Sequence, residues 1–196
     1  MTEDMSLKTF IPEIEANARE ARSTFGALTP VQLNWKPAPE RWSVAQCLEH
    51  LIVIERKYWP TFERVASGAF RESRLRRMMF PRWQGETMLR YVEPRQPKKY
   101  PTARSAYPSA GEIGADIVER FDAHERELIG HIERMAGRES GDSVIASPVF
   151  GLVSYSVRDA LRILVAHQRR HFGQARRVME TAGFPEEASA SSASAS

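Results

Sequence analysis

The sequence predicts an all-α protein, a four-helix bundle with a long crossover loop between its second and third helices. Four segments carry apolar residues at spacings of three and four, and no segment shows the sustained alternation typical of a β-strand. The chain has 196 residues, which is enough to build one hydrophobic core. We therefore expect a single domain over residues 1–185. Residues 186–196 are rich in Ala and Ser and are expected to be disordered.

Start and stop signals bound the first two helices. The first helix is expected over residues 6–28, because a Thr-Pro pair follows it. The second helix begins after Ser43, since Ser43 and Gln46 have the spacing of a capping box, in which each side chain accepts a hydrogen bond from the other residue's backbone N–H. It should run over residues 44–67, with Pro60 interrupting or kinking its second half.

A long connection separates the second helix from the third. Residues 70–107 contain several prolines and no sustained helical period, which predicts a crossover loop with a functional or mobile role. The third helix is expected over residues 110–135, where apolar residues form a stripe. A Gly/Ser/Pro-rich linker over residues 137–155 precedes the fourth helix, which is capped by Ser156 and ends near Gly183.

Cysteine content and hydropathy bear on the compartment. The single cysteine, Cys47, cannot form a disulfide within the chain, which favours a reducing cytoplasm. The longest purely aliphatic stretch, residues 51–54, has four residues, whereas a membrane-spanning helix needs about 20. We therefore expect a cytoplasmic protein without a membrane partner.

Three histidines fall on corresponding flanks of two predicted helices. With about 100° of rotation per residue, His167 and His171 lie one turn apart at the edge of the apolar face of the fourth helix, and His50 has the same position on the second. If these helices are neighbours, three imidazoles surround one point. Imidazole nitrogens suit Zn, Ni or Fe, and three protein ligands leave coordination positions open for water or substrate. Two histidines four residues apart are more often surface residues than ligands, so spacing alone leaves both interpretations open.

Other ionisable residues on the apolar faces compete for a role. His124 and His131 lie near the stripe of the third helix, where either would serve as a ligand or as a packing residue with satisfied hydrogen bonds, and we favour packing. Glu55 falls in the middle of the apolar arc of the second helix, where a carboxylate is costly without a partner. Three roles are open for Glu55: a hydrogen bond to an imidazole, action as a base, or an ion pair with an arginine. We prefer the buried ion pair. Cys47 lies on the same arc, and a buried thiol is not expected to be a nucleophile.

Two segments of the chain resemble a known family. They are LNWKPAPERWSVAQCLEHLIVIE (residues 33–55) and SPVFGLVSYSVRDALRILVAHQRRHFGQARRVM (residues 147–179). Together they resemble the DinB/YfiT-like superfamily, close in pattern to its DinB_2 branch. The specific elements are the helix start at Trp42 and Ser43 with a His seven residues beyond the Ser, and the later pattern HxxxHxxQ.

The resemblance implies a fold, a metal site and a class of activity. In this family a four-helix bundle binds a divalent metal, and the matching ligands here are His50, His167 and His171. Gln174 matches the Gln of the family pattern, which implies a structural role or the positioning of a ligand. Similar members include S-transferases and isomerases that use low-molecular-weight thiols, and others are described as metal-dependent hydrolases. Despite the name of the family, the resemblance gives no reason to expect DNA binding.

Charge is distributed unevenly along the chain. The net charge is +3, but residues 71–104 carry +7 and the remainder −4. We interpret this basic segment as a site for anionic groups of a small substrate, or as a solvated loop. A further interpretation is that part of this segment, RLRRMMFPRW (residues 74–83), forms a surface that binds nucleic acid or anionic lipid. We prefer a loop with an apolar underside, which would roof the metal site or supply a homodimer contact.

Two functional hypotheses follow from these observations. The first is a metal-dependent enzyme that transfers a small thiol, or activates water, at a centre held by the three histidines. Glu55, Gln174 and His124 are then candidates for supporting the ligands or positioning the substrate, and no catalytic residue is assigned. The alternative is a non-catalytic binding or stress-response module with a structural or vestigial metal. The two hypotheses differ in whether ligands such as azide or thiols can enter open coordination positions of the metal.

Overall fold

The computed structural model is mostly helical and contains one small β-sheet. It describes residues 6–72, 83–93, 106–138 and 141–186. The predicted disordered tail therefore lies, from residue 187 onward, outside the described residues. Within those residues, no helix combines the length and the apolar character that crossing a membrane requires.

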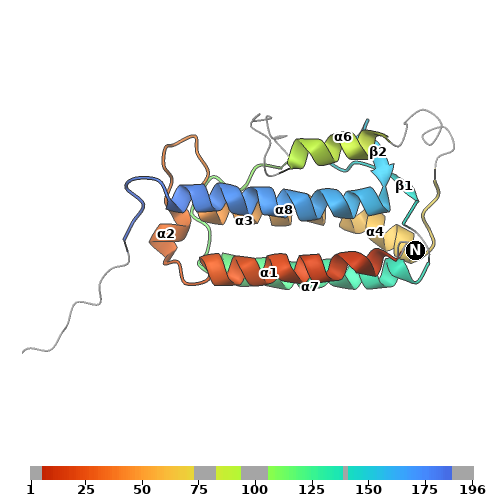
Figure 1. The fold of residues 1–196 in the computed structure, drawn as a ribbon, viewed down its shortest axis with the longest axis horizontal. Helices are drawn as coiled ribbons and strands as arrows, with labels where there is room; N and C mark the ends of the chain where they lie inside the picture. The colour runs from red at the N-terminus through yellow and green to blue at the C-terminus, as the bar shows by residue number, and fades with distance from the viewer. Residues whose placement is uncertain (1–5, 73–82, 94–105, 139–140, 187–196) are drawn as a thin grey trace, which may run out of the picture.

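Four long helices pack side by side. They are α1 (Ile11–Phe25), α3 (Val44–Arg56), α7 (Ile117–Ala136) and α8 (Val157–Met179). Figure 1 shows α3 and α8 in one layer and α1 and α7 in the other, and both helices of each layer contact helices of the other. The apolar stripes predicted from the sequence face inward, because the residues that define them on α3, α7 and α8 are almost all buried.

A layer of buried polar side chains divides the core into two apolar clusters. On α8 the first cluster includes residues 157–165 and the second residues 172–178, with Gln168 between them. The other three long helices contribute polar residues at the same level. The complete layer consists of Asn17, Glu55, His124, Glu125 and Gln168, each at most 2% exposed.

The predicted second helix is broken into two, as Pro60 suggested. The capping box at Ser43 is present, and α3 ends at Arg56. A separate helix, α4 (Trp59–Ala66), follows, with Pro60 in its first turn, where the missing proline N–H leaves no hydrogen bond unmade. At the other end of the chain, Leu7–Phe10 forms a 3-10 turn (η1) before α1, and Pro30–Asn34 forms the short helix α2.

The expectation of a chain without strands is wrong in one place. Residues in the predicted linker form a hairpin of β1 (Val144–Ala146) and β2 (Ser154–Ser156), which pair antiparallel. Each strand has three residues, which is too short for alternation to be detected in a sequence. The hairpin is held by its buried contacts, including a hydrogen bond of 2.5 Å between the hydroxyls of Tyr155 and Tyr58.

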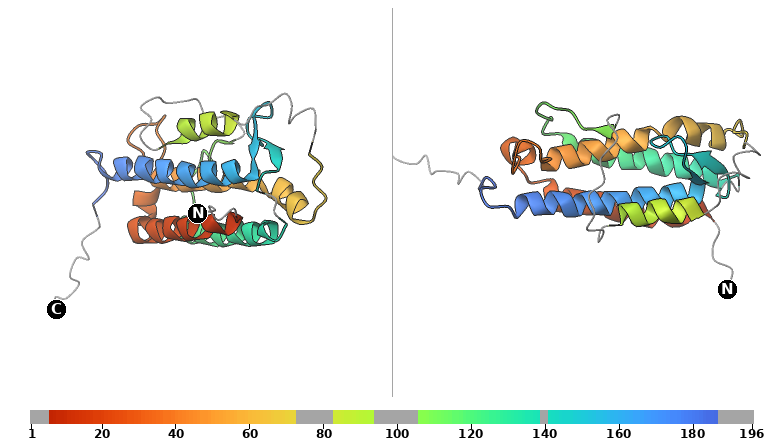
Figure 2. Two further views of the ribbon diagram at one scale, coloured as in Figure 1. Left: turned by 45° about the vertical axis from the view of Figure 1, so that its right-hand side comes forward. Right: turned by 90° about the horizontal axis from the view of Figure 1, so that it is seen from above.

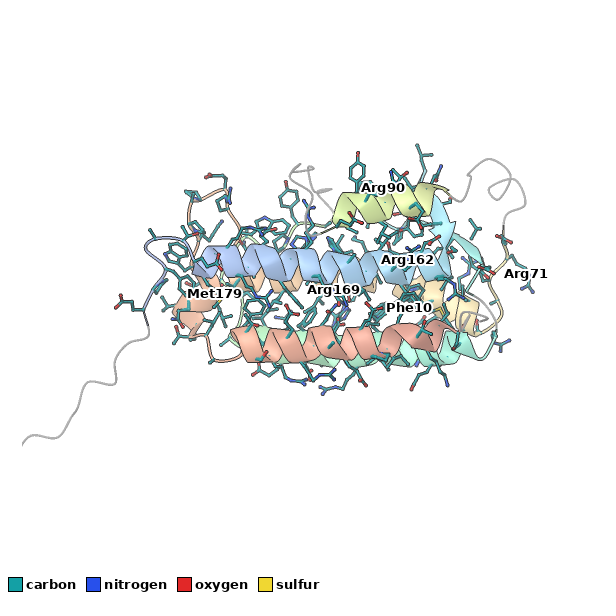
Figure 3. All side chains as sticks on the ribbon, in the orientation of Figure 1. Phe10, Arg71, Arg90, Arg162, Arg169 and Met179 are labelled. Atoms are coloured by element: carbon teal, nitrogen blue, oxygen red, sulfur yellow. The ribbon has the colours of Figure 1, made fainter. Side chains whose placement is uncertain are left out.

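The predicted crossover loop contains a helix that the sequence did not reveal. Helix α6 (Trp83–Val92) runs along the outer side of α8, as Figures 1 and 2 show. Gly85 permits this close approach, because a Cβ at that position would lie 2.6 Å from a carboxylate oxygen of Asp159. Arg162, labelled in Figure 3, ion-pairs with Glu86 of α6 at 2.7 Å. Most of the basic segment, residues 73–82 and 94–105, lies outside the described residues.

The third long helix begins later than predicted. Helix α7 starts at Ile117 instead of near residue 110. The preceding residues are held in a non-helical form by Asn34, whose side chain accepts from Ile113 N at 2.8 Å and donates to Ile113 O at 2.9 Å. These two bonds satisfy the backbone groups that a helix would otherwise use.

Candidate metal centre

Three imidazoles from α3 and α8 converge on one point. The Nε2 atom of His167 lies 3.4 Å from Nε2 of His50 and 3.0 Å from Nε2 of His171. His50 and His171 are buried and His167 is half-buried. Helical counting placed these side chains on corresponding flanks of their helices, and the contact between α3 and α8 brings them together (Figure 1).

The spacing of the three nitrogens fits a shared metal ion. Nitrogen ligands at 2.0 to 2.1 Å from one ion lie about 2.8 to 3.4 Å apart for octahedral or tetrahedral angles. The two Nε2 separations, 3.0 and 3.4 Å, lie within this range. All three nitrogen atoms lie within 4.8 Å of one another. The donor set and its spacing are therefore suited to a divalent transition metal.

A backbone carbonyl fixes the tautomer of His50. Its Nδ1 lies 2.6 Å from the carbonyl oxygen of Ala106. Because a carbonyl only accepts hydrogen bonds, Nδ1 must carry the proton and donate it. The Nε2 atom of the neutral ring then keeps its lone pair and points toward His167, which is the form that binds a metal.

The surroundings keep all three imidazoles neutral. Burial is the largest cause in each case and lowers the pKa of His50, and lowers the pKa values of His167 and His171 well below the ordinary range. The mutual proximity of the rings and the positive charge of Arg170 add to the shift of the pKa values of His167 and His171. At neutral pH the group is therefore ready to donate lone pairs without first releasing protons.

Aromatic side chains line one side of the three histidines. The Trp42 ring lies 4.8 Å from the His50 ring and stacks on the His171 ring at 5.7 Å, measured between centroids. Tyr107 meets Trp42 edge-on at 6.2 Å and is about half exposed. Trp42 therefore excludes water from this side and restricts both rings, while Tyr107 lies at the solvent rim.

Two further residues of α8 act on the site. Gln174, the last residue of the HxxxHxxQ pattern, is half-buried, and its amide partly opposes the lowering of the pKa of His171. Arg170 donates to the carbonyl oxygens of Tyr91 and Glu93 at 3.3 and 3.2 Å, which ties the end of α6 to this part of α8. A fixed positive charge therefore lies next to the histidines.

The other predicted residues, Glu55 and His124, belong to the polar layer instead. His124 Nε2 lies 3.0 Å from one oxygen of Glu55, and Gln168 Nε2 donates to the other oxygen at 3.0 Å. Among the described residues Glu55 pairs with an imidazole, which was one of the alternatives for it, and with no lysine or arginine. His124 Nδ1 is buried without a hydrogen-bond partner in the described part of the chain, so the expectation of fully satisfied packing for His124 is wrong.

Glu125 was missed by the sequence analysis. Gln168 Nε2 donates to both of its carboxylate oxygens, at 3.0 and 2.9 Å, and Asn17 in turn donates to Gln168 Oε1 at 2.6 Å. The signal for Glu125 was the gap in the apolar stripe of α7, because residue 125 lies four residues after Phe121 and three before Leu128.

Glu55, His124 and Glu125 are also close enough to hold a metal ion. The amide nitrogen of Gln168, however, lies within 3.0 Å of oxygens of both glutamates, so it fills the space between them. Burial and the charge of Glu55 raise the pKa of Glu125 well above its ordinary value. The raised pKa favours the protonated form of Glu125, which lowers the negative charge of this layer.

The model of the DinB superfamily matches residues 13–175. The match runs from α1 through most of α8 and includes the three histidines, Gln174, and the whole polar layer. No curated protein sequence and no solved structure is significantly similar to the chain.

Proposed function

The chain belongs to the DinB superfamily, and from this premise we propose that it is a divalent-metal-dependent enzyme in which His50, His167 and His171 hold the metal. Its activity is the transfer of a small thiol, or of water, to an electrophile. The fold is a four-helix bundle of α1, α3, α7 and α8, with α6 inserted in the crossover between the second and third of them.

The convergence of three neutral Nε2 atoms carries this proposal. Among described residues, only His50, His167 and His171 supply three imidazoles to one point. Three protein ligands leave further coordination positions open, which is typical of catalytic rather than structural sites. When bound, a divalent ion lowers the pKa of a thiol or water ligand and so supplies a nucleophile at neutral pH.

The surrounding residues define what the site accepts. Ala106 O orients His50, and Trp42 packs against the rings of His50 and His171 and restricts them. Arg170 contributes a positive charge close enough to lower the pKa values of His167 and His171. The same charge favours an anionic group on the incoming molecule. These features support a small thiol or electrophile that carries a carboxylate.

Metal content and turnover test the proposal together. Protein purified without an affinity tag is analysed for bound Zn, Ni and Fe, as wild type and as His167→Ala. His131→Ala is the matched control, because His131 is a buried imidazole that packs against Trp59 and does not belong to the group of three histidines. We expect about one metal equivalent in the wild type and the control, and none in His167→Ala.

Turnover is measured with glutathione or cysteine and a chlorodinitrobenzene electrophile. Activity should follow metal content across the three proteins. Turnover that persists in metal-free His167→Ala would contradict the proposal. A bound metal that accepts neither azide nor thiol, in a protein without turnover, would favour a non-catalytic module with a structural metal.

A further inference from the structure

One face of α3 holds the segment that precedes α7. We call this segment, residues 106–113, the strap. Glu49 and His50 lie three and four residues after Gln46 on α3, so each is a neighbour of Gln46 on the surface of the helix. His50 donates to Ala106 O at 2.6 Å, and Gln46 Nε2 donates to Ser109 O at 2.9 Å. The strap therefore carries the one carbonyl that fixes the His50 tautomer.

Glu49 makes the other contacts of this face. Its two carboxylate oxygens accept from the backbone N–H of Ser109 at 2.6 Å and from the Ser109 hydroxyl at 3.1 Å. Glu49 is only 9% exposed. A buried carboxylate that accepts from a backbone N–H forms a strong, charge-assisted hydrogen bond. Neither oxygen is directed to a lysine or arginine among the ion pairs of the described residues, so the structural role of Glu49 is to hold Ser109.

The chain between Ala106 and Ser109 has little freedom. Tyr107 precedes Pro108, which confines its backbone to extended conformations. The Tyr107 ring also packs against Trp42. Because only two residues separate the anchored ends, the position of Ser109 determines where the Ala106 carbonyl lies.

We propose that Glu49 is a positioning residue of the metal centre, because it holds the strap so that Ala106 O keeps His50 protonated at Nδ1 and free at Nε2. The part of this inference that concerns metal binding rests on the proposed function. Without Glu49, the backbone N–H and the hydroxyl of Ser109 lose their acceptor, and the remaining bond from Gln46 to Ser109 O holds the Ala106 carbonyl less firmly. His50 then adopts either neutral tautomer, and the one protonated at Nε2 has no lone pair for a metal.

The far end of the strap offers a matched control. Asn34 makes two hydrogen bonds with Ile113, at 2.8 and 2.9 Å, just as Glu49 makes two with Ser109. Asn34→Ala and Glu49→Ala therefore remove the same number of bonds from the same strap, but at opposite ends. Glu49→Gln is the conservative variant, because its amide oxygen still accepts from Ser109 N and its NH2 donates to the hydroxyl of Ser109.

The first measurement uses the metal-free protein. Long-range ¹H–¹⁵N NMR spectra report which ring nitrogen of His50 carries the proton. We expect Nδ1 to be protonated in the wild type, in Glu49→Gln and in Asn34→Ala, and a mixture of tautomers in Glu49→Ala. A wild-type His50 protonated at Nε2, or an unchanged tautomer in Glu49→Ala, would overturn the inference whether or not the protein binds metal.

The second measurement is a competition titration with Zn²⁺ and a chromogenic chelator. Glu49→Ala should bind Zn²⁺ about 10- to 100-fold more weakly than the wild type. Glu49→Gln and Asn34→Ala should bind within experimental error of the wild type. If Asn34→Ala weakens binding as much as Glu49→Ala, the effect is a general loosening of the strap, and the assignment to Glu49 fails. A wild type that binds no Zn²⁺ contradicts the proposed function, while the tautomer result still decides the role of Glu49.

Discussion

Gln168 and Glu125 face each other in the centre of the core, where one amide nitrogen donates to both oxygens of the carboxyl group at 3.0 and 2.9 Å. The same nitrogen donates to Glu55 at 3.0 Å. In sequence, Gln168 directly follows His167, so neighbouring residues of α8 serve the polar layer and the histidine group separately. Substitutions on α8 can therefore separate the stability of the core from metal binding.

We predict that Gln168→Leu destabilises the protein strongly. Leucine fills a similar volume but leaves Glu55 and Glu125 without their shared donor, and unsatisfied buried polar groups cost about 1 to 3 kcal/mol each. A loss of about 2 to 4 kcal/mol is expected, measured by urea denaturation in the presence of a chelator so that bound metal does not contribute. Gln174→Leu, at a half-buried position on the same helix, is the control. Equal losses in both variants would contradict the role given to Gln168.

Glu125 makes stability depend on pH. Burial and the charge of Glu55 hold its pKa well above the ordinary value of about 4.3, so the folded protein binds a proton that the unfolded chain releases. The stabilisation by this protonated carboxyl is complete below the unfolded pKa and is lost as pH rises through the folded pKa.

Glu125→Gln should remove that loss, because glutamine keeps an uncharged side chain of the same shape. We predict that the variant gains stability relative to the wild type as pH rises, by about 1 kcal/mol or more between pH 5 and 8. Denaturation curves over this range test the prediction, with Glu133→Gln on the exposed side of α7 as the control. Parallel pH profiles for Glu125→Gln and the wild type would show that Glu125 is already ionised in the folded protein.

The capping box of α3 should contribute to stability. Ser43 Oγ accepts from Gln46 N at 3.1 Å, and Gln46 Oε1 accepts from Ser43 N at 3.2 Å. Ser43→Ala is expected to cost about 1 kcal/mol, and Thr29→Ala, in the equivalent box of α2, should cost a similar amount. Because α3 also carries His50, only Ser43→Ala should weaken Zn²⁺ binding as well. Unchanged Zn²⁺ affinity in Ser43→Ala would show that the start of α3 does not position His50.

The sequence was sufficient to place the three histidines because helical periodicity determines their angles. The rotation per residue fixes where His167, His171 and His50 lie on their helices, whereas the contact between α3 and α8 was only a condition in the sequence analysis and comes from the structure. Glu125 was also within reach, since it interrupts an otherwise regular stripe. The support of His50 by Ala106 was not, because a backbone carbonyl 56 residues away carries no side-chain signal. Helix α6 and the hairpin are short, and short segments have weak local preferences. Their structure therefore depends on tertiary packing, which the sequence pattern does not show.

The lowered pKa values of the three histidines lead to a last prediction, on the pH dependence of metal binding. An exposed histidine has a pKa of about 6.5, so a surface pair begins to lose metal to protons near neutral pH. Burial lowers the pKa values of His50, His167 and His171, so protons compete with the metal only at lower pH. We expect Zn²⁺ affinity to stay nearly constant from pH 8 to about 6.5 and to fall below it, in competition titrations at each pH.

The metal-free protein provides an independent check on the same pKa values. Unfolded histidines bind protons that the buried imidazoles do not, so the free energy of unfolding should fall as pH drops below about 6.5. His167→Ala and His171→Ala should each reduce this slope, whereas Gln174→Ala, which removes the amide that partly opposes the lowering of the His171 pKa, should not reduce it. If Zn²⁺ affinity instead declines steadily from pH 8, and the slope is the same in all three variants, the imidazoles exchange protons freely with solvent and the site is not the desolvated one described above.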